Sequence, residues 1–375
     1  MKQTLTYAVK FLPTPEQELL LFRTCKTFID ACGTVSEWCR ENHCLSQKKI
    51  RDAMYLRLRS EYGLGSQMAQ SAISRVIGNY RTIRENHGSP WHGKRACKYT
   101  SVGYDAVWNR DYSVSKAGVV SVNTLAGRVK LQADWSHVPE PYRRGRYGTA
   151  RIIRRNGKWL MLIPMSVMLP DPPRPQRVTG IDLGLRFLAV SYDGDGNTRF
   201  HPGKEVTQKR AQYKALRTDL QKRGTRSARK RLKSIGNREN RWMTQVNHRV
   251  SKALVAECDR PTLLALEDLK GVRKATERVG RSQRYVQVSW AFFQLRQMVE
   301  YKARGAGHTV MLVDPAYTSQ TCPKCGTVRK ANRKHDKHLY VCANCGYRSN
   351  DDRVAAMNIQ RLGYQSLLET GVSTS

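Results

Sequence analysis

The sequence has 375 residues, and Lys and Arg outnumber Asp and Glu by 66 to 30, giving a formal net charge of +36. A surplus of this size indicates a polyanionic partner, and nucleic acid is the default choice. A membrane is disfavoured, because no stretch reaches the roughly 18 uninterrupted apolar residues of a spanning helix, and the amino terminus lacks the apolar run of a secretory signal. A hydrophobic fraction of 40% is enough for two or three domains with real cores.

The first predicted elements are a strand and a long amphipathic helix. Residues 2–11 alternate in polarity as a strand does. Thr14, followed by Pro15 and Gln17, is typical of a capped helix start. Apolar residues at steps of four and three then share one helix face, and this pattern predicts core positions rather than ligands even for the cysteines: Leu21, Cys25, Phe28, Cys32, Val35 and Cys39.

Two further helices are expected to complete a helical lobe over residues 13–94. One spans about 46–62, and the next is expected to be capped by Ser66. The polar face of the third helix is basic, which leaves two interpretations: a solvated surface, or contact with phosphates, which the net charge favours. The residues of that face are Arg75, Arg81 and Arg84.

From about residue 98 the hydrophobic period changes to that of short strands. Asn156-Gly157 is a strong signal for a type I′ hairpin. We expect an antiparallel, barrel-like module formed by residues 1–12 and 95–170, with the helical lobe inserted into it. A stiff proline-rich linker over 171–176 is expected to separate this module from the rest of the chain.

The next domain begins with an apolar strand, 177–182, which ends on Asp182. Residues 187–192 are expected to pair back onto it. A carboxylate in this place is typical of the opening of the ribonuclease H type of nuclease fold. It can equally cap a neighbouring turn, and both interpretations stay open here.

A strongly basic segment follows, predicted to be helical over residues 204–242. It carries fourteen Lys and Arg against three acidic residues. Such a density of like charge would repel itself without counter-charge, and the backbone of a nucleic acid would supply that counter-charge.

The remaining elements carry acidic residues at their ends. An apolar strand over 261–268 runs into Glu267, where burying an unpaired carboxylate is costly unless a cation binds. An amphipathic helix is expected to open at Ser289, and another apolar strand covers 309–314. A last helix is expected to start at Asp351-Asp352.

Four cysteines near the carboxyl end form two C-x₂-C pairs: Cys322, Cys325, Cys342 and Cys345. Their spacing is that of a tetrahedral Cys₄ site, so we expect one structural Zn²⁺ in a module over 321–346. A glycine after each pair suits a tight turn. The alternatives are two disulfides or reduced core cysteines, and a reducing compartment disfavours the disulfides.

Three acidic positions far apart in sequence each lie at the edge of a predicted core element: Asp182, Glu267 and the Asp351-Asp352 pair. Together they fit a site for two Mg²⁺ ions about 4 Å apart, as phosphodiester hydrolysis requires. His308 and His335 are interpreted as ordinary residues.

Four motifs, taken together and in this order, resemble the TnpB (OrfB-type) proteins of insertion sequences. They are 178–184 (VTGIDLG), 266–269 (LEDL), 314–326 (DPAYTSQTCPKCG) and 341–359 (VCANCGYRSNDDRVAAMNI). The resemblance is close over about 177–362 and extends to the amino-terminal half only in layout.

The resemblance implies an RNA-guided DNA endonuclease of a transposable element, related to type V CRISPR effectors. The implied fold is multidomain α/β: a β-barrel wedge domain with an inserted helical recognition lobe, and an RNase H-like (RuvC) nuclease domain, 177–320 and 347–375, with an inserted zinc module. Its implied partners are a guide RNA from the element end and double-stranded DNA next to a short flanking motif. The implied location is the cytoplasm of a bacterium or archaeon, with the protein associated with the nucleoid when it is bound to DNA.

The resemblance also assigns residues. The family's catalytic acids fall on Asp182, Glu267 and Asp352, which would hold Mg²⁺, and its zinc ligands fall on the four paired cysteines. The family usually has Asn two residues after its last aspartate, where this chain has Val354, so Asp351 stays open as the alternative ligand. Two other functions also stay open: a guided DNA-binding repressor without cleavage, and an RNA-independent transposase or nuclease.

Overall fold

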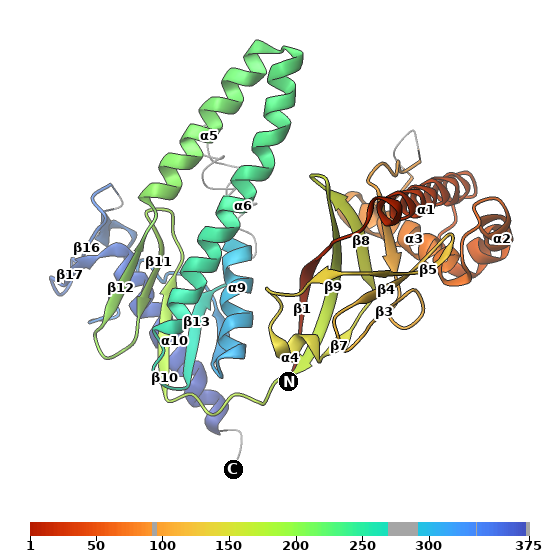
Figure 1. The fold of residues 1–375 in the computed structure, drawn as a ribbon. Helices are drawn as coiled ribbons and strands as arrows, with labels where there is room; N and C mark the ends of the chain where they lie inside the picture. Colours follow the sequence, from red (N-terminus) through yellow and green to blue (C-terminus); the bar gives the residue numbers. More distant parts are fainter. Residues whose placement is uncertain (92–95, 269–291, 335, 373–375) are drawn as a thin grey trace. The chain divides into compact units, whose positions relative to one another are not determined.

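The computed structural model describes residues 1–91, 96–268, 292–334 and 336–372 (Figure 1). The chain divides into two compact units, Met1–Met168 and Leu169–Ser375. Several sequence-based expectations lie outside the described residues: the boundary at 94 and 95, Leu269 of the second motif, the helix start at Ser289, and His335.

The larger sheet of the first unit is antiparallel. β1 (Lys2–Phe11) pairs along most of its length with β9 (Lys158–Met168), which also pairs with β8 (Ala150–Arg155). The β8–β9 turn has positive φ at both Asn156 and Gly157, as the predicted type I′ hairpin requires. The strand order is β2-β8-β9-β1-β6 with β7 on β9, and the other strands are β2 (Gly103–Ala106), β6 (Ala133–Asp134) and β7 (Arg146–Tyr147).

A second, three-stranded sheet, β3-β4-β5, stands apart from this one. Its tight connections explain the separation, because Gly118 and Gly127 adopt positive φ and close a local meander. The strands are β3 (Tyr112–Val114), β4 (Val120–Thr124) and β5 (Gly127–Leu131), followed by the short helix α4 (Glu140–Arg143).

Three helices follow β1 and precede β2: α1 (Pro15–Glu41), α2 (Gln47–Ser60) and α3 (Ser66–His87). α1 starts with the predicted capping box, in which the Gln17 amide donates to the Thr14 hydroxyl and the Thr14 amide donates to the Gln17 side chain. All six residues of the predicted apolar stripe of α1 are at most 1% exposed, which confirms that its cysteines are core residues.

One expectation for α3 was wrong, and a second fails only at Arg75, because Arg81 and Arg84 are exposed. Gly65, not Ser66, is the residue before the helix, and the Ser66 hydroxyl instead accepts a hydrogen bond from Tyr55. Arg75 does not lie on a solvated basic face. Its side chain is 8% exposed, lies 3.4 Å from the Asp105 carboxylate of β2 and covers the ring of Phe28. A guanidinium neutralised in this way is not free to bind phosphate.

The second unit is built on a five-stranded sheet of order β12-β11-β10-β13-β14. β10, β13 and β14 run parallel, whereas β11 and β12 are antiparallel to their neighbours. The strands are β10 (Arg177–Asp182), β11 (Phe187–Tyr192), β12 (Thr198–Pro202), β13 (Thr262–Glu267) and β14 (Thr309–Val313).

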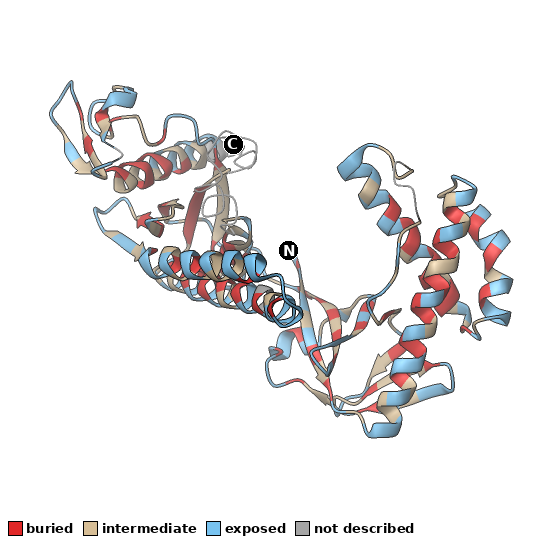
Figure 2. Cartoon of the chain, turned by 90° about the horizontal axis from the view of Figure 1, so that it is seen from above, coloured by how far each residue is buried: buried red, intermediate tan, exposed pale blue. Residues whose placement is uncertain are grey.

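Helices cover both faces of this sheet (Figure 1). α6 (Arg226–Ala256) and α9 (Phe292–Gly305) pack on one face, and α10 (Asp351–Val372) packs on the other. Alternate residues of β13 therefore enter two different cores, with Leu264 and Leu266 toward α6 and α9 and Leu263 and Ala265 toward α10. Figure 2 shows buried positions concentrated on one side of the long helices.

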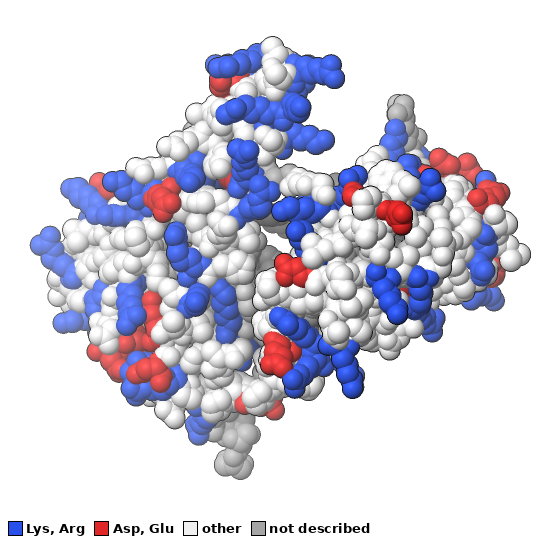
Figure 3. All heavy atoms as spheres, in the orientation of Figure 1, with Lys and Arg blue, Asp and Glu red and all other residues white. Residues whose placement is uncertain are grey.

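The predicted basic helix is broken into a hairpin of α5 (Lys204–Arg223) and α6, because Gly224 takes the left-handed conformation that ends a helix. Its outer part is held by a small apolar cluster that includes Leu220, Ala228 and Ile235, and Lys and Arg cover it in Figure 3. Inside the hairpin, Glu239 is buried between Arg210 and Arg217.

The approach of α10 to the sheet gives a prediction about Gly180 of β10. A Cβ there would come within 3.0 Å of backbone atoms of Ala356 and Gln360 in α10. We expect Gly180→Ala to lower the free energy of unfolding of the second unit by about 3 kcal/mol or more, because a packed backbone cannot move aside. Chemical denaturation followed by circular dichroism measures this.

Gly305→Ala is the matched control, because no atom lies within 4 Å of a Cβ at that exposed end of α9. It should change stability by no more than about 0.5 kcal/mol. Equal effects of the two substitutions would contradict the close approach.

Candidate metal-binding active site

Asp182 and Glu267 lie side by side at the carboxyl ends of neighbouring parallel strands. The last paired residues of β10 and β13 are Ile181 and Leu266, and each strand's next residue is the acidic one. Partners in a parallel pair point to the same face of a sheet. Val178 and Leu263, which share this parity, contact the core beneath α10, so both carboxylates lie on the α10 side.

The amino-terminal turn of α10 brings Asp352 to the same place. α10 crosses the sheet in backbone contact at Gly180, where it presents Ala356. Asp352 is one helical turn before Ala356, and Asp182 is two residues after Gly180 on the same face. Asn350 fixes this turn by accepting hydrogen bonds from the amides of Asp352 and Arg353, at 3.0 and 3.1 Å.

The carboxylates of Glu267 and Asp352 act electrostatically on Asp182. Burial raises the pKa of Asp182 well above its ordinary value, and the charges of Glu267 and Asp352 raise it further. Burial also raises the pKa of Glu267 and of Asp352. Like charges held together in this way are unfavourable when ionised, and a divalent cation among them would reverse that penalty. The donor set is all oxygen, which fits a hard ion such as Mg²⁺.

Arg333 is a member of this site that the sequence did not reveal. It comes from β15 (Arg333–Lys334), in the segment between the two cysteine pairs. Its Nε donates to the Asp351 carboxylate at 2.9 Å, and its Nη2 lies 3.6 Å from Asp352. Its charge lowers the pKa of all three candidate catalytic carboxyls. No sequence pattern distinguishes this arginine from its many basic neighbours.

Asp351 and Asp352 have different surroundings. Asp351 is fully buried against Arg333, and its Oδ1 lies 3.7 Å from Nδ1 of His338. Asp352 is 13% exposed and acts more strongly than Asp351 on the pKa of Asp182. Val354 packs among Cys322, Tyr340 and Cys342 rather than toward the carboxylates, which explains how an apolar residue is accommodated there.

A loop after β14 holds Glu267 in place. The Thr318 hydroxyl donates to the Glu267 carboxylate, which opposes the rise in its pKa caused by burial. Asn358 of α10 donates to the carbonyl oxygens of Thr318 and Thr321, at 2.7 and 2.8 Å. Thr318 lies within the third sequence motif, but the motif alone gave it no role.

The four paired cysteines converge as predicted. All four Sγ atoms lie within 4.8 Å of one another, and the Cys322–Cys345 and Cys325–Cys342 pairs are each 3.6 Å apart. Tetrahedral zinc bound at about 2.3 Å would place sulfurs roughly 3.8 Å apart, so the cluster fits such an ion. Gly326 and Gly346 both have positive φ and close equivalent turns.

Small strands frame this cluster, namely β15, β16 (Leu339–Val341) and β17 (Arg348–Asn350). β17 leads directly into α10, so the cysteine cluster and the carboxylates are joined by a continuous piece of chain.

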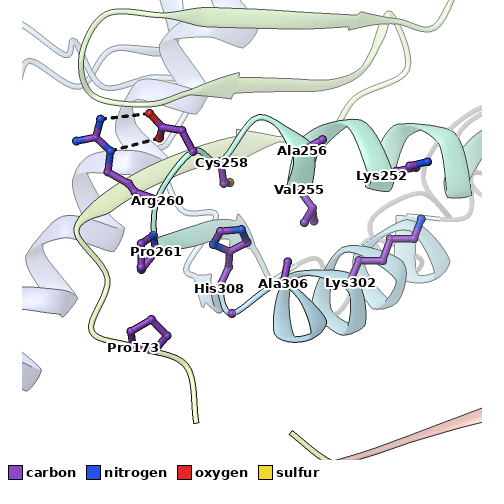
Figure 4. Close-up of a pocket in the computed structure, with 12 residues that line it drawn as sticks. Pro173, Lys252, Val255, Ala256, Cys258, Arg260, Pro261, Lys302, Ala306 and His308 are labelled. Carbon is purple, nitrogen blue, oxygen red and sulfur yellow. Dashed lines mark hydrogen bonds and ion pairs between the residues drawn. The ribbon is translucent and has the colours of Figure 1, made fainter. Parts of the chain in front are cut away.

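A cavity of about 740 Å³ lies elsewhere in the second unit, at the amino ends of β13 and β14 (Figure 4). Its lining includes Lys252, Lys302 and His308 and none of the three carboxylates. His308 accepts a hydrogen bond from the Thr262 amide and joins strand to loop, as expected of an ordinary residue. The carboxylate site thus lies at the opposite, carboxyl ends of the strands, where the sites of parallel α/β sheets usually lie.

Among the described residues, no helix has the length and apolar character needed to span a bilayer.

Two stretches of the chain are similar to a known class of protein. Residues 161–276 match the family model OrfB_IS605, described as a probable transposase, and residues 292–359 match the Cas12f1-like TNB domain. The first match contains Asp182 and Glu267, and the second contains the cysteines and Asp352. The resemblance to TnpB proteins that the motifs indicated is thereby confirmed.

Individual relatives agree with this class. A Cas12f1 endodeoxyribonuclease of Syntrophomonas palmitatica is 24% identical over 55% of this chain and 43% of its own length. A TnpB-like protein of Methanocaldococcus jannaschii is 27% identical over 59% of this chain and 80% of its own length. The match thus spans less than half of the first relative.

A solved structure is similar in fold to most of this chain. The cryo-EM structure of a Cas12f1–sgRNA–target DNA complex matches with a TM-score of 0.63 at 16% identity, covering 92% of this chain and 83% of that one.

The like charges of the site predict a dependence of stability on pH. A carboxyl whose pKa is raised in the folded state holds its proton more tightly there than in the unfolded state. Its contribution to the free energy of unfolding is therefore present below about pH 4 and is lost as the pH rises through the raised pKa. We expect Asp182→Asn to stabilise the metal-free protein near neutral pH by about 1 to 2 kcal/mol and to flatten this dependence. Thermal denaturation from pH 4 to 8 measures both effects.

Asp314→Asn is the control, because that carboxylate is exposed. Its Oδ1 accepts a hydrogen bond from the backbone amide of Ala316, and the side-chain oxygen of asparagine could accept the same bond. Added Mg²⁺ should stabilise the wild type more than Asp182→Asn. A wild type that is more stable than Asp182→Asn without metal would contradict the repulsion.

Proposed function

We propose that this protein is an RNA-guided DNA endonuclease that cleaves double-stranded DNA by metal-dependent hydrolysis at Asp182, Glu267 and Asp352. The observation that carries the proposal is the meeting of these carboxylates from β10, β13 and α10. Glu267 and Asp352 both raise the electrostatic cost of ionising Asp182. The order of the strands and the two-sided helical cover support an RNase H-like, RuvC-type fold for this unit.

The three carboxylates would hold two Mg²⁺ ions, which supply an activated water and stabilise the leaving oxygen of the phosphodiester. Asp352 is preferred to Asp351 as a ligand, because it acts more strongly on Asp182 and is partly exposed, whereas Asp351 is fully buried and accepts a hydrogen bond from Arg333 at 2.9 Å. Arg333 opposes the rise in the pKa of the three carboxyls, and the Thr318 hydroxyl orients Glu267.

The nucleic-acid partners are proposed from charge and from the relatives. The α5–α6 hairpin presents a dense array of exposed Lys and Arg, and acids neutralise only part of it. Duplexes and single strands carry the complementary charge. The Cas12f1 of similar fold was solved with a guide RNA and target DNA, and we propose the same two classes of partner here, with a short motif flanking the target.

We propose a division of labour along the chain that follows the expected boundaries. Residues 1–12 and 95–170 would form the wedge domain, 13–94 a recognition lobe, 177–320 and 347–375 the nuclease, and 321–346 a zinc module. The proposed zinc is structural, since all four thiolates are supplied by the chain and no position is left open for a water or substrate.

The endonuclease proposal is tested with protein purified together with its RNA, Mg²⁺, and plasmids that carry a matched target beside a randomised flank. We expect linearised plasmid with the wild type and a loss of about 10³-fold or more in rate with Asp182→Ala, because one of the carboxylates that would hold the metal is removed. RNA binding, measured by filter retention, should be unchanged in Asp182→Ala.

Binding of the target without cutting by the wild type would instead identify a guided repressor. Cutting of branched DNA by RNA-free protein would identify an RNA-independent nuclease. Either result contradicts the proposal.

The zinc module has its own test. Elemental analysis should find about one zinc per chain, and Cys342→Ser should lose most of it and lower the thermal stability of the second unit, since metal binding is coupled to folding. Cys258→Ser is the control, because Cys258 lies outside the cysteine cluster and its thiol donates to the Leu254 carbonyl of α6. Zinc-free protein that melts at the same temperature as the zinc-loaded protein would contradict a structural ion.

A further inference from the structure

An exposed tyrosine stands on the loop next to the carboxylates in a conformation that costs energy. Tyr317 has a φ of +62° and a side chain that is 61% exposed. The other described non-glycine residues with positive φ are Asn or His, which adopt it more readily. For a bulky side chain this conformation costs roughly 1 kcal/mol or more. Glycine would avoid this cost, so the fold alone does not account for a tyrosine here.

The backbone of this loop is tightly fixed. The amides of Gln320 and Thr321 both donate to the Tyr317 carbonyl, at 2.9 and 3.0 Å. Asn358 holds the carbonyls of Thr318 and Thr321 from α10. The loop therefore presents the Tyr317 ring from a rigid support, and loss of conformational freedom on ligand binding is small.

The position of the ring relative to the reactive groups is also constrained. The residue after Tyr317 is buried Thr318, whose hydroxyl donates to the Glu267 carboxylate. β14, which leads into the loop, ends at Val313, and Val313 is directly opposite Glu267 in the sheet. The chain from 314 to 317 is exposed throughout. An exposed tyrosine thus lies on the loop that also carries Thr318, the hydrogen-bond partner of Glu267.

We propose that Tyr317 is a stacking subsite for an unpaired nucleobase of the strand that enters the carboxylate site. This inference rests on the proposed nuclease function and adds to it a residue that would contact the substrate strand. A base in a duplex has both faces covered by its neighbours, whereas an unstacked base offers a face to an aromatic ring. Such stacking is tolerant of sequence, since every base has a π-face.

The test is binding of a six-nucleotide single strand that carries 2-aminopurine, whose fluorescence is quenched when it stacks. The full chain is titrated with Ca²⁺ in place of Mg²⁺, at about 0.3 M salt, where backbone electrostatics are weakened. Wild type and Tyr317→Phe should quench and bind alike. Tyr317→Gly should weaken binding by about 5- to 100-fold and abolish quenching.

Tyr317→Gly separates a binding role from a structural one. Glycine adopts the positive φ at residue 317 without strain, so this variant should melt at the same temperature as the wild type or higher. It should nevertheless lose stacking of the 2-aminopurine base. Tyr364→Ala is the control variant. It removes a tyrosine of similar exposure, 50%, that lies about three helical turns after Asp352 in α10, and it should bind the strand like the wild type.

Tyr317→Gly that binds and quenches like the wild type would overturn the subsite, and so would a wild type that does not quench. Neither result depends on cleavage, so failure of the subsite is distinguishable from failure of the nuclease proposal. In the RNA-loaded protein, a pre-opened target should show a raised KM and a nearly unchanged kcat with Tyr317→Gly.

Discussion

Backbone contact between α10 and β10 at Gly180 is the constraint on which the site depends. With no side chain at that position, the helix lies directly on the strand and its first turn reaches the carboxyl edge of the sheet. Parallel pairing of β10 with β13 already brings Asp182 beside Glu267. The helix adds the third carboxylate from 170 residues further along the chain. Three acids thus meet because one strand residue lacks a Cβ.

The same meeting places a cost on the protein. Burial and mutual repulsion raise the pKa of the clustered carboxyls, and within the described residues Arg333 is the cation that opposes this for all three. Arg333 belongs to the segment between the cysteine pairs, so the proposed zinc module would do more than stabilise its own fold. It would fix the position of a guanidinium that lowers the pKa of all three carboxyls, and β17 would connect this module directly to the start of α10.

The sequence was sufficient for features set by local periodicity and by spacing. The capped start of α1 at Thr14, its buried stripe, the Asn156-Gly157 hairpin, the strands that end in Asp182 and Glu267, and the cysteine pairs were all predicted correctly. Each depends on residues close together along the chain, or on a metal-ligand spacing that few other structures use.

The sequence was insufficient where partners are distant. No residue near Arg75 in the sequence indicates that Asp105 will neutralise it. The sequence pattern of a basic helix face is the same whether that face contacts water or a carboxylate. Gly224 was read as an interior residue of one helix, although its left-handed conformation turns that helix into a hairpin. Arg333 could not be selected among 66 basic residues, because its role comes from the packing of the cysteine-rich segment against α10.

The central claim is that Asp182, Glu267 and Asp352 bind divalent ions jointly, and titration of the metal-free chain with Mn²⁺, followed by electron paramagnetic resonance, tests it most directly. The account predicts about two ions per chain and a similar loss of affinity when any one of the three is replaced by its amide, with Asp314→Asn unchanged. Mn²⁺ affinity that survives the amide replacement of one of the three, with the stoichiometry intact, would contradict it.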